Sequence, residues 1–423
     1  MAVGAFLEPL VVVSLLFGGA YFNRNKDYNF SQGSAGWAGE KDLQQQHLKK
    51  SDDVPPRRLS TDSWSESSTP TLGPVEQSTW RRRKFQLFGY KKLVTTPNTL
   101  VFKDRFLSRV LYKFPFLTEA WYWALIYWVY QVGRAFTALT LVEGTVNVAR
   151  KHALQLIHIE QSLGIFWEVG FQKWFLAHPE ILHWINRIYS FIHIPGSIFF
   201  IVVLFYLTTT RKRRVMTGRV ATDTISAGPA LYENRRRTMA MCNLLAFIIF
   251  TFWPCMPPRL LSDPSYEGED AAESKSFGFV DTVHSKAGES SVWTTNKFCN
   301  QYAAMPSLHF GYSLLIGLTI ATLPVNGVRP GSWKRIAIVV GGLSYPALIL
   351  TVIVATANHF ILDAVAGAMV CGIAWNFNHI LLNFCIIEDY FLWLVRIHKP
   401  VNVTDPETAV EPEYQSALLS EQV

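Results

Sequence analysis

A histidine and an aspartate in the last quarter of the sequence have a spacing that suits nucleophilic chemistry. His359 and Asp363 are four residues apart, so a helix places both side chains on one face. A carboxylate there accepts the proton of one imidazole nitrogen, which fixes the tautomer and leaves the other nitrogen free to attack. We therefore expect His359 to be a nucleophile and Asp363 to orient it and stabilise its positive charge.

A second histidine, His309, lies in the first turn of a helix that we expect to begin at Pro306-Ser307. Ser307 suits the N-cap position, and the unpaired backbone N–H groups of a first turn bind anions. Arg259, in the segment WPCMPPRLL, offers a planar fork for phosphate oxygens.

These residues predict a phosphoryl-transfer site. His359 would form a phosphohistidine, and His309 would protonate the leaving oxygen and then deprotonate the incoming alcohol or water. Arg259, Ser307 and the helix N-terminus would hold the phosphate oxygens.

Helices must position these residues, because the composition is that of a membrane protein. Of the 423 residues, 17% are charged and 49% are hydrophobic, and the hydrophobic residues form long runs. The net charge of +7 is therefore weak evidence for nucleic-acid binding, and we expect no nucleic-acid partner.

The sequence predicts an all-α fold, a polytopic membrane helical bundle. Seven stretches are long enough to cross a bilayer, which needs about 20 residues of helix: 5–22, 118–142, 190–208, 238–255, 306–324, 335–357 and 360–385.

Basic clusters orient this bundle. Residues 211–214 follow the third stretch, 235–237 precede the fourth and 334–335 precede the sixth, which marks these ends as cytosolic. Segments 143–189 and 256–305 then face the lumen or the exterior. We expect one or two short interfacial helices in the first of these segments.

The candidate site residues all fall at the lumenal boundary of this topology, although they were not used to choose it. Taken alone, each has a structural explanation: a helix stop for Arg259, a helix cap for Ser307 and an interfacial hydrogen bond for a histidine. Their joint occurrence at one boundary favours a site.

The domain organisation follows from the same topology. Residues 1–22 are expected to be a membrane anchor rather than a signal peptide, because positive charge follows the apolar run instead of preceding it. Residues 23–117 are polar and aperiodic, which predicts a disordered cytosolic region with a basic run at 81–84. Residues 118–385 form the catalytic membrane domain, and 386–423 form a cytosolic tail.

Two of the quoted segments also resemble a known family. YAAMPSLHFGYS and TANHFILDAVAG are similar to the second and third signature motifs of the PAP2 (type 2 phosphatidic acid phosphatase) superfamily. WPCMPPRLL and the upstream segment ARKHALQLIHIEQSLGIFWEVGFQKW resemble the branch that contains the inositol phosphorylceramide synthases. The resemblance covers about residues 118–385. It implies a six-helix core, phosphohistidine chemistry with neither metal nor cofactor, and a lipid or prenyl phosphate substrate.

The sequence departs from the common PAP2 motifs at two cationic positions. Phe252 stands where the first motif has a Lys, and Ile353 stands where the third motif has an Arg. Replacement charge is expected from Arg134, Arg150, Lys151 or Lys297. Arg134 is the strongest of these, since an intramembrane Arg is a functional candidate, although helix packing or snorkelling also explains it.

Two further pairs of residues leave alternatives open. Tyr189 and His193 adjoin the start of the third stretch on the lumenal side, where they either line the site or only pack. Cys255 and Cys299 bracket the lumenal loop and either form a disulfide in an oxidising compartment or remain reduced.

Three functions fit these observations. The first is an inositol phosphorylceramide synthase-like phosphotransferase of sphingolipid metabolism, an inositolphosphotransferase with a lipid-linked phosphate as donor. The second is a lipid or prenyl (pyro)phosphate phosphatase with water as acceptor, and the third is a non-catalytic membrane scaffold. The resemblance and the topology together imply an endomembrane protein of the Golgi or ER whose site faces the lumen.

Overall fold

The chain is helical almost throughout the part that the computed structural model describes, which comprises residues 2–31, 79–140, 144–283 and 301–400. The predicted all-α fold is therefore confirmed, with one β-hairpin added. Two compact units are distinguished: unit 1 contains Met1–Arg24 and Phe116–Leu381, and unit 2 contains Asn25–Pro115 and Leu382–Val423.

The long helices of unit 1 coincide with the seven predicted membrane stretches. They are α1 (Ala2–Phe22), α4 (Phe116–Thr140), α8 (His193–Phe205), α10 (Pro229–Phe252), α12 (Leu308–Thr322), α13 (Trp333–Ala355) and α14 (Ile361–Phe377). Among the described residues, three continuous helical stretches are long and apolar enough to cross a membrane, namely His193–Met216, Trp333–Ala355 and Ile361–Leu394. These stretches indicate an integral membrane protein.

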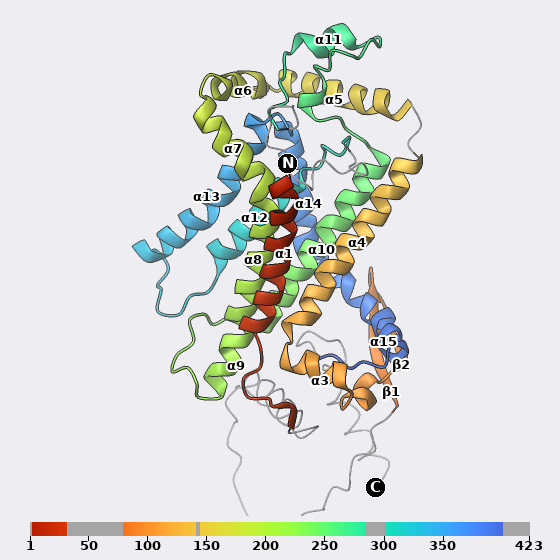
Figure 1. Ribbon diagram of the computed structural model, residues 1–423, viewed down its shortest axis with the longest axis vertical. Coiled ribbons are helices and arrows are strands. Elements are labelled where there is room, and N and C mark those ends of the chain that lie inside the picture. The colour runs from red at the N-terminus through yellow and green to blue at the C-terminus, as the bar shows by residue number, and fades with distance from the viewer. Residues whose placement is uncertain (1, 32–78, 141–143, 284–300, 401–423) are drawn as a thin grey trace, which may run out of the picture. The chain divides into compact units, whose positions relative to one another are not determined.

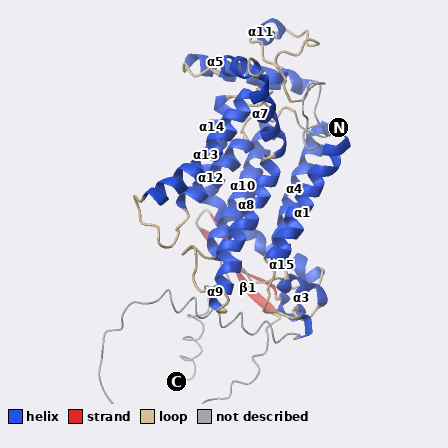
Figure 2. Cartoon of the chain, turned by 60° about the vertical axis from the view of Figure 1, so that its left-hand side comes forward, coloured by secondary structure: helices blue, strands red, loops and turns tan. Residues whose placement is uncertain are grey.

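Shorter elements connect and cover this bundle. They are α5 (Gly144–Ser162), α6 (Glu168–Leu176), α7 (Pro179–Phe191), η3 (Tyr206–Thr210), α9 (Arg211–Met216), η4 (Pro258–Leu260), α11 (Ala271–Ser276) and η5 (Asn378–Phe384). The two views agree that α5 lies across one end of the bundle (Figures 1 and 2). The expected short helices within 143–189 are thus present as α5, α6 and α7, although their interfacial location stays a prediction.

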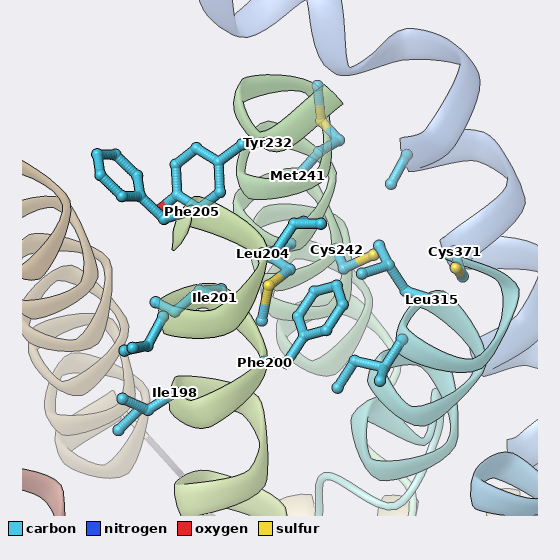
Figure 3. Close-up of a cluster of buried hydrophobic side chains, with 14 of the residues drawn as sticks. Ile198, Phe200, Ile201, Leu204, Phe205, Tyr232, Met241, Cys242, Leu315 and Cys371 are labelled. Atoms are coloured by element: carbon cyan, nitrogen blue, oxygen red, sulfur yellow. The ribbon is translucent and has the colours of Figure 1, made fainter. Parts of the chain in front are cut away.

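The core of unit 1 forms where α8 meets α10, α12 and α14 (Figure 3). Its members are aliphatic, aromatic and sulfur side chains, which suits a helix whose neighbours are helices on several sides. They include Ile198, Phe200, Ile201, Leu204, Phe205, Tyr232, Met241, Cys242, Leu315 and Cys371.

A second core cluster packs α5 onto the loops that end α10 and begin α14. Ala153 and Ile157 of α5 contact a group that includes Met256, Leu261 and Phe360, all of which are buried. This packing holds the two loops that carry Arg259 and His359 beneath one amphipathic helix.

Glycines allow α12 to approach α14 closely. A Cβ atom on Gly367 would lie 2.3 Å from the Ser307 carbonyl oxygen, and one on Gly311 would lie 3.1 Å from the Gly367 carbonyl oxygen. The helix starts are also hydrogen bonded, since the Ser307 N–H donates to the Asp363 carbonyl oxygen at 2.9 Å. The close approach therefore fixes the first turns of α12 and α14 against each other.

Unit 2 contains a β-hairpin of β1 (Trp80–Leu87) and β2 (Tyr90–Pro97), together with η2 (Thr99–Phe102), α3 (Phe106–Lys113) and α15 (Cys385–Leu394). The strands are antiparallel, and their register pairs Leu87 with Tyr90 next to the turn. Phe88 and Gly89 form that turn with φ of 44° and 88°, as a two-residue hairpin loop of the primed type requires.

The order in unit 2 corrects part of the expected domain organisation. Disorder was expected over 23–117 and fraying in the tail 386–423, but residues 79–117 form the hairpin and α3, and α15 extends to Leu394. The basic run is a strand, so Arg81 and Arg83 point to one side, and both bind the buried carboxylate of Asp389, to which Thr96 also donates at 2.7 Å. This partner lies about 300 residues away, beyond the reach of local composition. Residues 32–78 and 401–423 lie outside the described part of the chain.

We expect Gly367→Ala to destabilise unit 1, because its Cβ would overlap a backbone carbonyl that cannot rotate away. Overpacking of this kind costs about 1–3 kcal/mol, which corresponds to a fall of roughly 2 °C or more in Tm. Thermal unfolding of the protein in detergent measures the change.

The matched control is Gly372→Ala in the same helix, where an added Cβ meets no atom within 4 Å. That variant should melt at or slightly above the wild-type temperature, since Ala has the higher helix propensity. Equal melting temperatures for the two variants would contradict the close approach of α12 and α14.

Candidate functional site

A cavity of about 350 Å³ lies within unit 1, between α4, α7, α8, α10 and α12. On α10 its lining residues extend from Tyr232 to Phe250, which is about 27 Å of helix at about 1.5 Å per residue. At the end near the C-terminus of α10 the lining residues include Arg259, His309, Asn358 and His359.

An ion pair lies at the opposite end of the cavity. Arg236 on α10 donates through Nη1 to both carboxylate oxygens of Glu119 on α4, at 2.6 and 2.7 Å. The Tyr232 hydroxyl donates to the same carboxylate at 3.1 Å, and the Arg236 guanidinium lies 4.6 Å from the centre of the Tyr122 ring. Both charges are thus satisfied within the protein, as burial requires.

Backbone hydrogen bonds join the three segments that the sequence singled out. The Cys255 N–H donates to Tyr302 O at 2.8 Å, which ties the Arg259 segment to the His309 segment. The Arg259 N–H donates to Ala357 O at 2.9 Å, which ties it to the His359 segment. The predicted meeting of the segments at one end of the bundle therefore has a main-chain basis.

The ring of His359 is held by a carbonyl more directly than by the aspartate. Its Nδ1 lies 2.8 Å from Ala304 O and 3.5 Å from Asp363 Oδ2. A carbonyl oxygen only accepts, so Nδ1 carries the proton and Nε2 keeps its lone pair. The expected tautomer therefore follows from the carbonyl, and Asp363 is a nearby charge rather than the primary partner.

His309 lies between aromatic rings on the cavity wall. Its ring centre is 5.6 Å from that of His359, 4.9 Å from that of Tyr189 and 4.4 Å from that of His193. The structure thus brings the two predicted histidines together. It also resolves the open alternative for Tyr189 and His193, because both line the cavity.

Ser307 is a helix cap, as predicted. Its Oγ accepts from the Phe310 N–H at 3.4 Å, and the residue is fully buried. The cap fixes the first turn that carries His309. Ser307 is not among the residues that line the cavity, so its predicted contact with phosphate stays a prediction.

Arg259 is the predicted cation that faces the cavity. Its Nε donates to Asn358 Oδ1 at 2.9 Å, and its Nη1 pairs with Asp281 at 3.1 Å. Asn358 directly precedes His359, so the guanidinium is positioned on the same segment as that histidine.

The expected replacement cations do not add charge to the cavity within the described residues. Arg150 donates to Leu261 O at 2.8 Å and lies 3.7 Å from the centre of the Tyr266 ring, and burial lowers its pKa. It therefore anchors the loop after α10, which corrects its suggested role. Lys151 is exposed and does not line the cavity.

The remaining cation and cysteine positions lie partly outside the described residues. Arg134 belongs to α4, but its side chain lies outside the described part of the chain, as do Lys297 and Cys299. Of the two alternatives for the cysteines, the structure has the reduced one at Cys255, which is a buried free cysteine. Phe252 is 81% exposed, whereas Ile353 is buried in an apolar cluster.

Two buried glutamates near this site were missed by sequence reasoning. Glu168 on α6 accepts from the Ile361 N–H at 3.0 Å, and Glu160 on α5 accepts from the Leu362 N–H at 2.8 Å. These carboxyl groups cap the N-terminus of α14, directly after His359. The eight-residue spacing of the glutamates gave no signal, because they lie on different helices and meet only on folding.

The pKa of Glu160 is strongly raised. Burial raises the pKa of Glu160 to about 9, and the hydrogen bond and charge of Glu168 raise it further towards that value. The Oε2 atoms of both residues are buried and have no hydrogen-bond partner among the described residues. Glu160 is therefore expected to keep its proton in the folded protein at neutral pH.

The comparisons with known proteins give one match. A family model described as the PAP2 superfamily matches residues 154–227 and 220–377. The matched residues include Glu160, Glu168, Asp363 and the three histidines that line the cavity, His193, His309 and His359. Neither a curated protein nor a solved structure matches the chain.

We expect Glu160→Gln to flatten the pH dependence of stability. Between the ordinary pKa of 4.5 and the folded pKa of about 9, the unfolded chain has lost the Glu160 proton and the folded chain keeps it. Wild-type stability therefore falls as pH rises from 5 to 9, by at most about 1.4 kcal/mol per pH unit for one proton. Gln keeps the acceptor for the Leu362 N–H and has no proton to lose. Tm measured across pH 5–9 tests this.

The control is Glu269→Gln, which changes an exposed carboxylate on the loop after α10. It should keep the wild-type slope. If Glu160→Gln keeps that slope too, a raised pKa of Glu160 is ruled out.

Proposed function

The chain belongs to the PAP2 superfamily and is thus a phosphatase or phosphotransferase of lipid-like phosphates; we propose that it is a membrane phosphotransferase that acts through a phosphohistidine. The observation that carries this proposal is the pair of histidines at one end of the cavity. His359 has its Nδ1 proton engaged by Ala304 O, so its Nε2 is available as a nucleophile. His309 faces it at a ring separation of 5.6 Å.

In the first half of the proposed reaction, Nε2 of His359 attacks phosphorus. A P–N bond forms, the P–O bond to the leaving alcohol breaks, and His309 gives that oxygen a proton. The charged imidazole ring is stabilised by Ala304 O and by the carboxylate of Asp363. Arg259 lies close enough to the His359 segment to neutralise the phosphate oxygens.

The second half reverses these steps with a new alcohol. The acceptor hydroxyl loses its proton to His309, its oxygen attacks phosphorus, and the P–N bond breaks. His359 and His309 return to their starting protonation states, so neither a metal nor a cofactor enters the balance.

The size and lining of the cavity support a lipid substrate. The stretch of α10 that lines the cavity is about 27 Å long, which is close to the roughly 30 Å thickness of a bilayer's hydrocarbon core. Aromatic side chains of α4 line it, among them Trp123, Tyr127 and Tyr130. A hydrocarbon chain can therefore lie along the cavity with its phosphate at the histidines.

The similarity of WPCMPPRLL and of the segment at 149–174 to the inositol phosphorylceramide synthase branch favours an alcohol as acceptor. The alternative with the same residues is a lipid or prenyl phosphate phosphatase. A lumenal site in the Golgi or ER is part of the proposal, because basic clusters 211–214 and 235–237 belong to the helix ends opposite the histidines.

The test is to incubate the purified protein with phosphorus-labelled phospholipids and ceramide and to separate the products. We expect label in a new phospholipid and, after rapid quenching, on a histidine of the protein. Label released only as inorganic phosphate would make the protein a phosphatase, and no product across the panel would favour a scaffold.

His359→Ala should abolish both products and the labelled protein while Tm stays within a few degrees of the wild-type value. His379→Ala is the control, since His379 is exposed and does not line the cavity. Activity of His359→Ala near that of the control would rule out the phosphohistidine mechanism.

We expect Asp363→Asn to separate the charge of Asp363 from its structural bond. Asn still accepts the Phe360 N–H, which now binds Asp363 Oδ2 at 2.9 Å, but it carries no charge to stabilise the imidazolium. Turnover should fall by about 10²-fold or more with little change in Tm. Wild-type turnover in this variant would mean that the Ala304 carbonyl alone supports His359.

A further inference from the structure

A third histidine shares the cavity with the two that the proposed mechanism uses. His193 is the first residue of α8 and lines the cavity wall. Its ring centre lies 4.4 Å from that of His309 at an interplanar angle of 44°, and 5.7 Å from that of Tyr312 at 21°. His309 therefore contacts an imidazole ring on two sides, His359 and His193.

The hydrogen bonding of His193 is incomplete. Its Nδ1 is buried and has no hydrogen-bond partner among the described residues. Leaving such a group unsatisfied costs about 1–3 kcal/mol, so a buried ring nitrogen without a partner favours the binding of a polar group. Because His193 lines the cavity beside His309, a molecule bound in the cavity can supply that group.

We propose that His193 is a second ligand of the alcohol oxygen, which it holds together with His309. This inference rests on the proposed function. A neutral imidazole with its proton on Nδ1 donates one hydrogen bond, and an alcohol oxygen accepts one while its own proton goes to His309. The leaving and accepting alcohols occupy this place in turn, and their oxygens gain negative charge in the transition states, where a fixed donor is most stabilising.

With this role for His193, the cavity has two separate binding sites for oxygen atoms of the substrates. Phosphate oxygens lie towards Arg259, and the hydroxyl oxygen of an alcohol lies between His309 and His193. The pair of histidines would thereby favour an alcohol over water, because an alcohol is held by its chain along the cavity as well as by its oxygen.

Three variants test the role. His193→Leu keeps most of the side-chain volume and removes the donor, whereas His193→Asn retains an N–H near the place of Nδ1. His379→Leu is the matched control, since it makes the same change at an exposed histidine that does not line the cavity.

The measurements use a labelled phospholipid donor and an alcohol acceptor that the wild-type protein turns over. We expect His193→Leu to raise the KM for the acceptor and to lower kcat, by roughly 10-fold or more in kcat/KM, and to release a larger fraction of label as inorganic phosphate. His193→Asn should recover part of both losses, and His379→Leu should match the wild type. Labelling of His359 by the donor should persist in all three variants.

A purely structural role would lower Tm without changing the division of label between alcohol and water. If the wild type is active and His193→Leu changes neither the KM for the acceptor nor the division of label between alcohol and water, this role of His193 alone is overturned. A wild type that turned over no donor in the panel would overturn the proposed function, and this role with it.

Discussion

The site depends on the way in which three carboxyl groups cap the start of α14. The N–H groups of Phe360, Ile361 and Leu362 donate, in that order, to Asp363, Glu168 and Glu160. A helix N-terminus buried without such partners would leave donors unsatisfied in an apolar setting, at a cost of several kcal/mol. Because His359 is the residue just before these donors, the cap that satisfies α14 also fixes the place of the proposed nucleophile.

The same cap links parts of unit 1 that are far apart in sequence. Glu160 and Glu168 come from α5 and α6, whose apolar residues also pack onto the loop after α10. On the other side, the start of α12 is held against α14 through Gly367 and through the bond from Ser307 to the Asp363 carbonyl. His309, His359 and Arg259 are therefore positioned by one connected set of backbone contacts rather than by three independent helices.

Few cationic side chains line the cavity. Arg259 and Arg236 are the cations among the described residues that line the cavity, and Arg236 is neutralised by Glu119 at the far end. The positions where common PAP2 motifs carry further cations hold an exposed Phe252 and a buried Ile353. The proposed phosphate site thus rests on Arg259, the histidines and backbone donors, which suits a cavity that must also accept a hydrocarbon chain.

The sequence by itself determined where the long helices of unit 1 lie and which side chains are candidates for chemistry. Long apolar runs predict helices because each helix satisfies its own backbone. His359, however, lies in the turn before α14 and not on one helical face with Asp363, as the spacing had predicted. The meeting of three segments at one end followed from alternating topology. Tertiary structure alone decided what each group binds. The carbonyl of Ala304 sets the tautomer of His359, and Glu160 and Glu168 cap α14. Arg150 anchors the loop after α10, and Arg81 and Arg83 bind Asp389 from the hairpin. These partners lie on different elements, and no local spacing encodes a contact that exists only after the elements have packed.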